Sequence, residues 1–462
     1  MIRLFRHYVP GSLLLLGMVE YLLLIFVMYT ALFFRWADVN SLAQSLSLHL
    51  PQAITFATVF TLTMFALGLY NKDYVRDIGT VLTRILFSLF FGCIVLAFLF
   101  YIYPDLAIWR SALAIALVGS FVCLMLVRWI HLKFADREAF KRRTLVLGVG
   151  ERAAKLEALE RSSQAQSFTC VGFVPLSDKN SKIEERVNIW GNMSLPDLVR
   201  EQNIEEIIVA IDERRGGMPV KALLECKLQG VMVTDFSTFW ERENGKMDLD
   251  ALYPSWLIFS DGFVGGWMQA MAKRIFDVVA SGTLLLFSLP IMVFAALAIK
   301  MESRGPIFYR QERVGLNGET FMLLKFRSMR TDAEKDGVPR WADLNDSRVT
   351  RVGSFIRQTR IDEIPQIFNV LKGEMSFIGP RPERPFFVDE LRQVIPYYFE
   401  RHRVKPGISG WAQLNYPYGA SVEDAKEKFQ YDLYYIKNYS LFLDLIVLVQ
   451  TARVVLWPDG VR

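Results

Sequence analysis

Residues 271–306, MAKRIFDVVASGTLLLFSLPIMVFAALAIKMESRGP, decide how the last third of the chain folds. Within them, residues 278–299 form an uncharged run of 22, which as a helix is long enough to cross the ~30 Å hydrocarbon core of a bilayer. Pro290 lies near the middle of this run, and a proline inside a helix removes a backbone hydrogen bond and kinks the helix. The stretch therefore predicts a membrane helix over about 275–300 that is broken at Pro290.

Basic residues flank this run on both sides. Lys273 and Arg274 precede it, and Lys300 and Arg304 follow it. Because cytoplasmic flanks of membrane helices are enriched in Lys and Arg, both ends are predicted to stay on the cytoplasmic side, as in a re-entrant helix hairpin. Ser288 is expected to bond a backbone carbonyl freed at the break. The alternative is a kinked spanning helix that places the C-terminal region outside.

The composition indicates a membrane protein. Of 462 residues, 52% are hydrophobic and 22% are charged, and the mean hydropathy is +0.24. Only 4 cysteines and 4 histidines are present, which argues against a disulfide scaffold, a zinc site or multi-histidine metal chemistry. A net charge of +5 suits contact with anionic lipid, and it is too small and too scattered for a nucleic-acid binder.

Four further apolar runs fill the first third of the chain, at about 12–34, 52–70, 82–103 and 111–130. They predict a four-helix transmembrane region over 1–134, and the first run is too long and lacks the small-residue site of a cleaved signal peptide. The basic residues that orient the region lie at its N-terminus, after the second run and after the fourth: Arg3, Arg6, Lys72, Arg76, Arg128, Lys133, Arg137, Lys141, Arg142 and Arg143. Both ends of the region, and everything that follows, are therefore expected at the cytoplasmic face.

Glu20 lies near the middle of the first run, and Arg84 lies near the edge of the third. An acid within the membrane raises the alternative of a proton or ion pathway. A single acid is a weak signal for transport, so we do not favour this alternative.

Residues 140–258 predict a Rossmann-like domain with a parallel α/β sheet. Short β-type runs such as CVGFV, EEIIVAI and VMVTDF alternate with helical stretches. At the first strand–helix turn, Gly148, Gly150 and Ala153 form G-x-G-x-x-A, where a dinucleotide pyrophosphate would sit on a helix N-terminus. The motif is weak by itself, and we favour a domain that has the turn for packing and is not catalytic.

A basic, β-rich segment follows the predicted hairpin: IFYRQERVGLNGETFMLLKFRSMRTDAE, residues 307–334. Its cations are interleaved with glycines, and they are Arg310, Arg313, Lys325, Arg327 and Arg330. Arginine binds phosphate oxygens in pairs and lysine acts as a point charge, so the segment predicts a phosphate site.

Two adjacent acids, Asp362 and Glu363, are the strongest candidates for catalysis. They follow Arg357 and Arg360 and precede Pro365. Two carboxylates together with a hard cation such as Mg²⁺ are a recurring arrangement in phosphoryl chemistry, and an aspartate can itself attack phosphorus. The alternative is that the two acids are an ordinary solvent-exposed pair, which is the more common case for adjacent acids in proteins.

The context decides between these readings. The segments KFRSM, RQTRIDEIPQ, NVLKGEMSFIGPRPERP and VKPGISGWAQ together resemble the bacterial sugar transferase family, the monotopic phosphoglycosyl transferases. The resemblance runs from residue 271 to the C-terminus, within a predicted catalytic domain at 265–462. With four membrane runs and a Rossmann-like middle domain, the whole chain is similar to the large members that initiate exopolysaccharide or O-antigen synthesis.

The resemblance implies an enzyme of the bacterial inner membrane with its active site on the cytoplasmic face. It would transfer sugar-1-phosphate from a UDP-sugar to undecaprenyl phosphate and release UMP. It implies that Asp362 is the nucleophile of an aspartyl-phosphosugar intermediate and that Glu363 ligates Mg²⁺. Residues implied to contact phosphate or nucleotide are Lys325, Arg327, Arg357, Arg360, Pro380, Arg381 and Pro382. A homodimer is also expected from the resemblance, and the sugar stays open.

Two other functions are considered. A membrane-anchored nucleotide-sugar dehydratase or epimerase would need a longer dinucleotide-binding fold and a Tyr-x-x-x-Lys pair, and the middle region has no such pair. A non-enzymatic scaffold of a polysaccharide export complex would have no need for the acidic pair.

Overall fold

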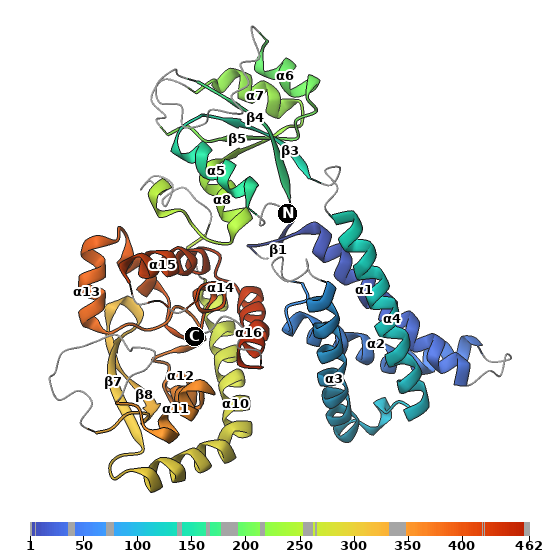
Figure 1. Cartoon of the computed structure of the whole chain (residues 1–462), viewed down its shortest axis with the longest axis vertical. Coiled ribbons are helices and arrows are strands. Elements are labelled where there is room, and N and C mark those ends of the chain that lie inside the picture. Colours follow the sequence, from blue (N-terminus) through green and yellow to red (C-terminus); the bar gives the residue numbers. More distant parts are fainter. Residues whose placement is uncertain are drawn as a thin grey trace. The chain divides into compact units, whose positions relative to one another are not determined.

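The computed structural model describes most of the chain as two compact units (Figure 1). One unit comprises Met1–Leu4 with Tyr8–Asn244, and the other comprises Phe5–His7 with Gly245–Arg462. The described residues exclude 1, 5, 36–41, 71–77, 136–140, 163–166, 177–192, 213–217, 253–261, 264–265, 332–347, 418, 420 and 457–462. The predicted orienting cations Lys72, Arg76 and Arg137 lie outside the described residues.

The first unit begins with a short hairpin, β1 (Ile2–Leu4) and β2 (His7–Val9), and four long helices. The helices are α1 (Gly11–Arg35), α2 (Leu42–Ala66), α3 (Ile78–Ile102) and α4 (Arg110–Ala135), with the short turn η2 (Pro104–Leu106) before α4. Residues 11–33, 78–102 and 110–133 are long and apolar enough to cross a membrane. The four helices coincide with the four predicted apolar runs.

A buried ion pair joins the first and last of these helices. Glu20 is fully buried, and both of its oxygens accept hydrogen bonds from Arg128, at 2.7 and 2.9 Å. The hydroxyl of Tyr70 donates to the same carboxylate at 2.5 Å. Arg128 was predicted to lie among the orienting cations after the fourth run, and this is wrong because it lies inside α4 at 1% exposure. The pairing gives Glu20 a structural role, which argues against an ion pathway.

The middle of the chain forms a parallel four-stranded sheet, as predicted. The strands are β3 (Arg142–Leu147), β4 (Phe168–Val174), β5 (Glu206–Val209) and β6 (Met232–Asp235), in the order β4-β3-β5-β6. Helices α5 (Glu151–Arg161), α6 (Leu195–Glu201), α7 (Val220–Leu228) and α8 (Phe236–Asn244) alternate with them. Apart from Thr144 and Glu206, the buried positions of β3 and β5 are aliphatic, which fits strands covered on both faces.

The second unit is α/β and contains every predicted catalytic residue. Its elements are η4 (Leu249–Ala251), α10 (Trp267–Glu302), β7 (Phe308–Val314), η5 (Leu316–Gly318), β8 (Thr320–Phe326), α11 (Arg351–Gln358), η6 (Ile361–Gln366), α12 (Ile367–Lys372), β9 (Ser376–Ile378), α13 (Pro385–Val394), η7 (Tyr398–Arg403), β10 (Gly407–Ser409), α14 (Trp411–Asn415), α15 (Val422–Lys437) and α16 (Leu441–Leu456). Strands β7 and β8 form an antiparallel hairpin, and β9 pairs with β10 in parallel.

This unit starts before the predicted boundary at residue 265. The amide of Met247 donates to the carbonyl of Gln430 at 3.1 Å, and Lys246 forms an ion pair with Glu427 at 2.7 Å. The segment before α10 is therefore tied to α15, and any isolated form of this unit needs it.

Helix α10 is a single hydrogen-bonded helix of 36 residues that changes direction along its length (Figure 1). A straight helix of that length would extend ~54 Å. The sequence predicted a break at Pro290, and the helix continues through that residue. The hydroxyl of Ser288 is buried and has no hydrogen-bond partner among the described residues, so the predicted bond to a freed carbonyl is wrong.

Both halves of α10 pack on the same folded unit. In its first half, Lys273 donates to Asp444 and to the carbonyl of Ile378, at 2.9 and 3.0 Å. In its last turn, Glu302 accepts hydrogen bonds from the amides of Arg351 and Val352. In its second half, Met292, Ala295 and Ile299 pack in one apolar cluster with Phe326 and Ile356.

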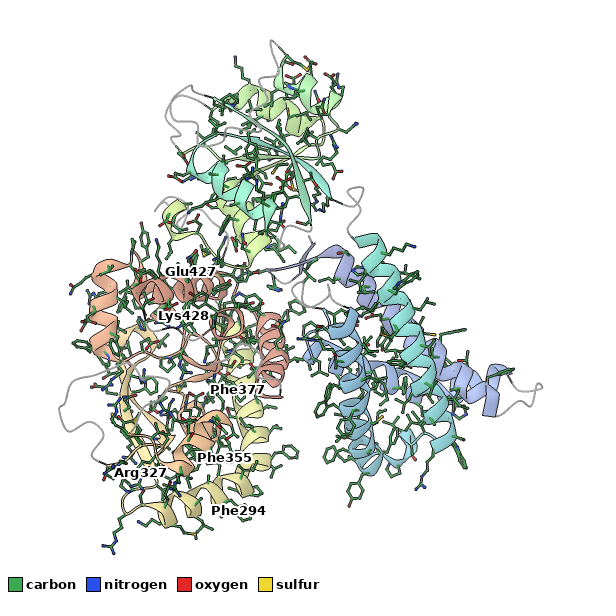
Figure 2. The ribbon with its side chains drawn as sticks, viewed as in Figure 1. Phe294, Arg327, Phe355, Phe377, Glu427 and Lys428 are labelled. Atoms are coloured by element: carbon green, nitrogen blue, oxygen red, sulfur yellow. The ribbon has the colours of Figure 1, made fainter. Side chains whose placement is uncertain are left out.

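Large apolar side chains cover the outer surface of the same helix. Phe294 is 71% exposed, and Phe355 on the neighbouring α11 is 60% exposed (Figure 2). The others on α10 with more than half of their surface exposed are Trp267, Met268, Ile275, Val279, Leu286, Phe287, Leu289, Val293, Leu297 and Met301. A contiguous apolar surface of this kind is typical of contact with a membrane.

Candidate active site

The acidic pair lies in a short 3₁₀ helix that follows a sharp reversal of the chain. Arg360 has a left-handed backbone with φ 58°, and it connects the end of α11 to η6. Ile361 and Ile364 pack against the core between α10 and β8. Since residues three apart share one face of a 3₁₀ helix, this packing turns Asp362 and Glu363 away from the core.

Glu363 is surrounded by positive charge. Its Oε1 accepts hydrogen bonds from Lys325 at 2.9 Å and from Arg381 at 2.8 Å. Its Oε2 lies 3.7 Å from the guanidinium of Arg360. Burial alone would raise the pKa of Glu363, but the charges of Arg381 and Lys325 outweigh it and hold the pKa well below its usual value. Glu363 is therefore ionised across the neutral range.

Asp362 has the opposite electrostatic character. It is 8% exposed and lines a cavity, and burial raises its pKa to about 6. The negative charge of Glu363 raises this pKa further, while Lys325 and Arg357 lower it. Burial also lowers the pKa of Lys325. Near neutral pH, Asp362 is a carboxylate with little solvation, which favours nucleophilic attack.

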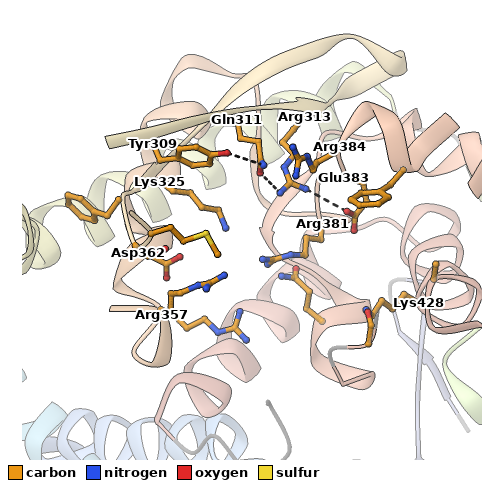
Figure 3. A pocket seen from close by; sticks show the side chains of 18 of the residues that line it. Tyr309, Gln311, Arg313, Lys325, Arg357, Asp362, Arg381, Glu383, Arg384 and Lys428 are labelled. Carbon is orange, nitrogen blue, oxygen red and sulfur yellow. Dashed lines mark hydrogen bonds and ion pairs between the residues drawn. The ribbon is translucent and has the colours of Figure 1, made fainter. Parts of the chain in front are cut away.

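The cavity beside Asp362 has a volume of about 610 Å³ and is strongly basic (Figure 3). Its cationic lining residues are Arg313, Lys325, Arg327, Arg330, Arg348, Arg357, Arg360, Arg381, Arg384, Arg401 and Lys428. Of the predicted phosphate or nucleotide residues, Lys325, Arg327, Arg357, Arg360 and Arg381 lie in this lining. Such a density of guanidinium groups suits a ligand with more than one phosphate.

The Pro-Arg-Pro loop beside the cavity is held in place by hydrogen bonds to its backbone carbonyls. The carbonyl of Pro380 accepts from the amide of Gly407 at 2.9 Å. The carbonyl of Arg381 accepts from Arg401, and that of Pro382 accepts from Arg313, both at 3.0 Å. Because these bonds use the main chain, the side chain of Arg381 is left to contact Glu363 and the cavity.

Arg401 is the functional candidate that the sequence did not reveal. It is 6% exposed, and besides the carbonyl of Arg381 it binds Asp432 at 2.9 Å and the hydroxyl of Tyr398 at 2.5 Å. Burial raises the pKa of Asp432 to about 6, although the charge of Arg401 opposes this. The signal in the sequence was an acid, Asp432, inside the tyrosine-rich run that forms α15.

Arg327 is placed differently from the other predicted phosphate residues. Its guanidinium donates to the carbonyls of Ser303 and Arg304, at 2.9 and 3.2 Å. It also donates to the hydroxyl of Ser303 at 2.8 Å. Cations near a helix C-terminus satisfy its unpaired carbonyls, so Arg327 closes the end of α10 in this structure. A phosphate contact by Arg327 stays a prediction.

The acidic pair is compatible with magnesium. Mg²⁺ in phosphoryl-transfer sites is commonly held by one or two carboxylates, with substrate phosphates and water completing the shell. Asp362 and Glu363 supply two such carboxylates, and the low pKa of Glu363 keeps it in the form that binds metal. Among the described residues there is no cluster of three or more His, Cys, Asp or Glu that would hold a metal without the substrate.

The glycine turn of the middle domain holds a carboxylate of its own chain. Asp212 accepts hydrogen bonds from the amides of Glu151 and Arg152 at the N-terminus of α5, at 2.8 and 3.3 Å. A Cβ on Gly150 would lie 1.9 Å from Asp212 Oδ2, and one on Gly148 would lie 2.4 Å from a backbone oxygen. The place of a pyrophosphate is thus filled by the carboxylate of Asp212, and this arrangement does not fit a dinucleotide phosphate there.

Two family models match the chain. The model described as bacterial sugar transferase matches residues 268–458, and the one described as CoA-binding domain matches residues 65–233. The first match contains α10, the acidic pair, the Pro-Arg-Pro loop and the cavity.

Curated relatives extend this match beyond the catalytic unit. A UDP-N-acetylgalactosamine-undecaprenyl-phosphate N-acetylgalactosaminephosphotransferase of Aeromonas hydrophila is 38% identical over 63% of this chain and 67% of its own length. A UDP-glucose:undecaprenyl-phosphate glucose-1-phosphate transferase of Escherichia coli (strain K12) is 32% identical over 75% of each chain. The enzyme of that same name from Xanthomonas campestris pv. campestris is 45% identical over 39% of this chain and 38% of its own. The chain belongs to the bacterial sugar transferase family.

Proposed function

We propose that the protein transfers sugar-1-phosphate from a UDP-sugar to undecaprenyl phosphate, with release of UMP. The observation that supports this most directly is a buried, ionisable Asp362 at the wall of a cavity lined by arginine and lysine. The names of the relatives supply the substrates, and the cavity has the charge that two approaching phosphates require. By the same resemblance, the reaction is the first membrane step of exopolysaccharide or O-antigen synthesis.

The first step of the proposed mechanism forms a covalent intermediate on Asp362. A carboxylate oxygen attacks the β-phosphorus, the bond from that phosphorus to the oxygen bridging to the α-phosphate breaks, and UMP leaves with the electron pair. Asp362 is suited to this because burial leaves its charged form poorly solvated. Lys325 and Arg381 lie within the same charge network and offset the repulsion between the carboxylate and the phosphates.

The second step returns Asp362 to its starting state. A phosphate oxygen of undecaprenyl phosphate attacks the same phosphorus, and the bond to the Asp362 oxygen breaks. The products are the polyprenyl diphosphosugar and a free carboxylate. Glu363 would hold Mg²⁺, and a bound Mg²⁺ would neutralise phosphate charge.

The proposed position of the enzyme at the membrane follows from α10. Lys273 at its start and Glu302 at its end both bond to the same folded unit, which supports a re-entrant helix with both ends on one side of the bilayer. In this proposal Asp362 lies at headgroup depth, where a lipid phosphate meets a soluble nucleotide. The positive flanks of the predicted spans support the cytoplasmic face of the inner membrane.

The test is transfer by the purified full-length protein. With UDP-sugar, Mg²⁺ and polyprenyl phosphate, we expect UMP and a glycolipid product. With UDP-sugar and no lipid, intact-protein mass spectrometry should show a sugar-phosphate adduct on the wild type and none on Asp362→Asn. Glu363→Gln should form product slowly, with some recovery at high Mg²⁺.

Three outcomes would count against the proposal. If the wild-type protein releases no UMP from any UDP-sugar, the proposed reaction is refuted. An adduct mapped to Glu363 would exchange the roles of the two acids. Glycolipid formation without any trappable adduct would favour direct transfer between the two substrates.

A further inference from the structure

The basic cavity also contains acidic side chains at its wall, and these are Asp362, Glu383 and Asp432. In Figure 3, Asp362 lies on one side of Arg381 and Glu383 lies on the other. Asp432 is 3% exposed and is paired with Arg401 at 2.9 Å, so it serves the fold. A carboxylate repels the phosphates that the cavity is proposed to bind. Glu383 is therefore expected at this wall only if it binds a neutral donor of the ligand.

The carboxylate of Glu383 is fixed in position and keeps its hydrogen-bonding capacity. The backbone carbonyl of Glu383 accepts from the amide of Val314 at 2.9 Å, which ties the residue to the end of β7. Its side chain is 29% exposed and contacts Arg313 through an ion pair of 3.6 Å, which is too long for a hydrogen bond. Among the described residues, no side chain or amide donates a hydrogen bond to either carboxylate oxygen. Both oxygens can therefore accept from a ligand in the cavity.

The in-line geometry of phosphoryl transfer places the nucleoside at the Glu383 end. In such a displacement the attacking and leaving oxygens lie roughly in line through phosphorus. With Asp362 as the attacking group, the α-phosphate and then the ribose extend away from Asp362, past Arg381. The transferred sugar is bonded to the attacked phosphorus itself and lies to the side of this line. This step rests on the proposed function.

Strand β7 gives the distance between the two ends. Tyr309 pairs with Lys325, which belongs to the charge network of Asp362. Arg313 lies four residues further along, on the same face of β7, and forms the ion pair with Glu383. Four residues of a strand extend ~13 Å, a length that one phosphate and a ribose can span from an attacked phosphorus. The ribose is therefore the part of the ligand that reaches Glu383.

We propose that Glu383 binds the ribose of the UDP-sugar by accepting hydrogen bonds from its 2′- and 3′-hydroxyl groups. These hydroxyls are neutral donors on neighbouring carbons, so one carboxylate can accept from both. Acidic side chains bind ribose in this way in dinucleotide-binding proteins, where an Asp or Glu binds the 2′-hydroxyl. The site selects a ribonucleotide over a deoxyribonucleotide, because an analogue without the hydroxyl leaves the carboxylate without its donor.

The experiment measures binding of UMP and 2′-deoxy-UMP to the full-length protein in nanodiscs by calorimetry. The wild type should bind UMP about tenfold more tightly, as for one hydrogen bond to a charged group. Glu383→Ala should abolish this preference. The same substitution should not weaken binding of 2′-deoxy-UMP, because it removes a negative charge from a phosphate-binding cavity.

Two further variants control for folding and for charge. Glu383→Gln keeps the side-chain volume and one acceptor oxygen, so it should show a smaller preference for UMP than the wild type. Glu390→Ala removes an exposed acid of α13 that lies outside the cavity lining, and it should keep the full preference.

The outcomes separate this proposal from the proposed function. Glycolipid formation by the wild-type preparation tests the transfer reaction itself. If that preparation is active but binds UMP and 2′-deoxy-UMP equally, the ribose contact is wrong. It is also wrong if Glu383→Ala or Glu383→Gln, with a melting temperature equal to that of the wild type, keeps the full preference. UMP carries no transferred sugar, so an unchanged UMP preference together with weaker UDP-sugar binding would assign Glu383 to the transferred sugar instead.

Discussion

The raised pKa of Asp362 predicts an acid limit to activity. A carboxyl whose pKa is about 6 is protonated below that pH and cannot attack phosphorus. The rate constant kcat/KM reports groups of the free enzyme, so its logarithm should rise with slope one up to about pH 6 and then level off. At pH 5 about one molecule in eleven carries the charged form, which predicts roughly a tenfold loss relative to the plateau.

Two substitutions should move this limit in opposite directions. Glu363→Gln removes a negative charge that raises the pKa of Asp362, so the limit should shift to lower pH. Arg357→Gln removes a positive charge that lowers it, so the limit should shift to higher pH. Each shift should be on the order of one pH unit, as for a charge a few ångströms away. The plateau value of kcat/KM will also fall, because both residues belong to the active site. The test uses only the pH at which kcat/KM begins to decline, so the plateau value does not affect it.

The assay is UMP release at limiting UDP-sugar between pH 4.5 and 8 in buffers of constant ionic strength. Asp389→Asn is the control, since Asp389 is an exposed acid on α13 and should leave the limit in place. The reasoning is refuted if the limit stays at the same pH in both Glu363→Gln and Arg357→Gln. It is also refuted if the wild type shows full activity at pH 4.5.

Three further predictions follow from other contacts. Arg401→Met should lower kcat at least tenfold, because it releases the carbonyl of Arg381. The same substitution should lower the melting temperature, because Asp432 is left buried and unpaired. Adding Asp432→Leu should restore the melting temperature but not kcat. Cysteines at Met268 and Arg304, both exposed and at opposite ends of α10, should react with the same cytoplasm-confined reagent; labelling from opposite sides would show a spanning helix. A chain that starts at Gly245 should bind membranes and release UMP; a folded but inactive product would show that residues before Gly245, which include Phe5–His7 of the second unit, are needed for chemistry.

Local patterns were sufficient to predict much of the architecture. The apolar runs coincide with α1–α4, and the alternation of β-type and helical segments coincides with the parallel sheet. Both signals depend on residues close together in sequence, which is why they are readable without a structure. The acidic pair and the basic segment before it were also visible, and the structure brings Lys325 and Arg381 onto Glu363.

What was not predictable depends on contacts between distant residues. Arg401 is defined by a carbonyl 20 positions away and an acid 31 positions away. Arg128 pairs with Glu20 across 108 positions, so by pattern alone it counted as one more orienting cation. Asp212 fills the glycine turn from 61 positions further on. In each case the chemistry of the residue was plain, but its partner was set by the tertiary fold.

The two adjacent acids show how burial and charge assign different tasks to identical chemical groups. Glu363 is held by Lys325 and Arg381, and their charge keeps its pKa far below neutral even though it is buried. Asp362 lies one residue away, at the cavity wall, and its pKa is near 6 because burial and the charge of Glu363 act together. When the pKa values of neighbouring acids are pushed apart, the acid whose pKa is closer to 7 is suited to form and break covalent bonds. The acid that stays charged is suited to electrostatic support. Composition cannot rank these two residues, and their surroundings support Asp362 as the nucleophile and Glu363 as its partner.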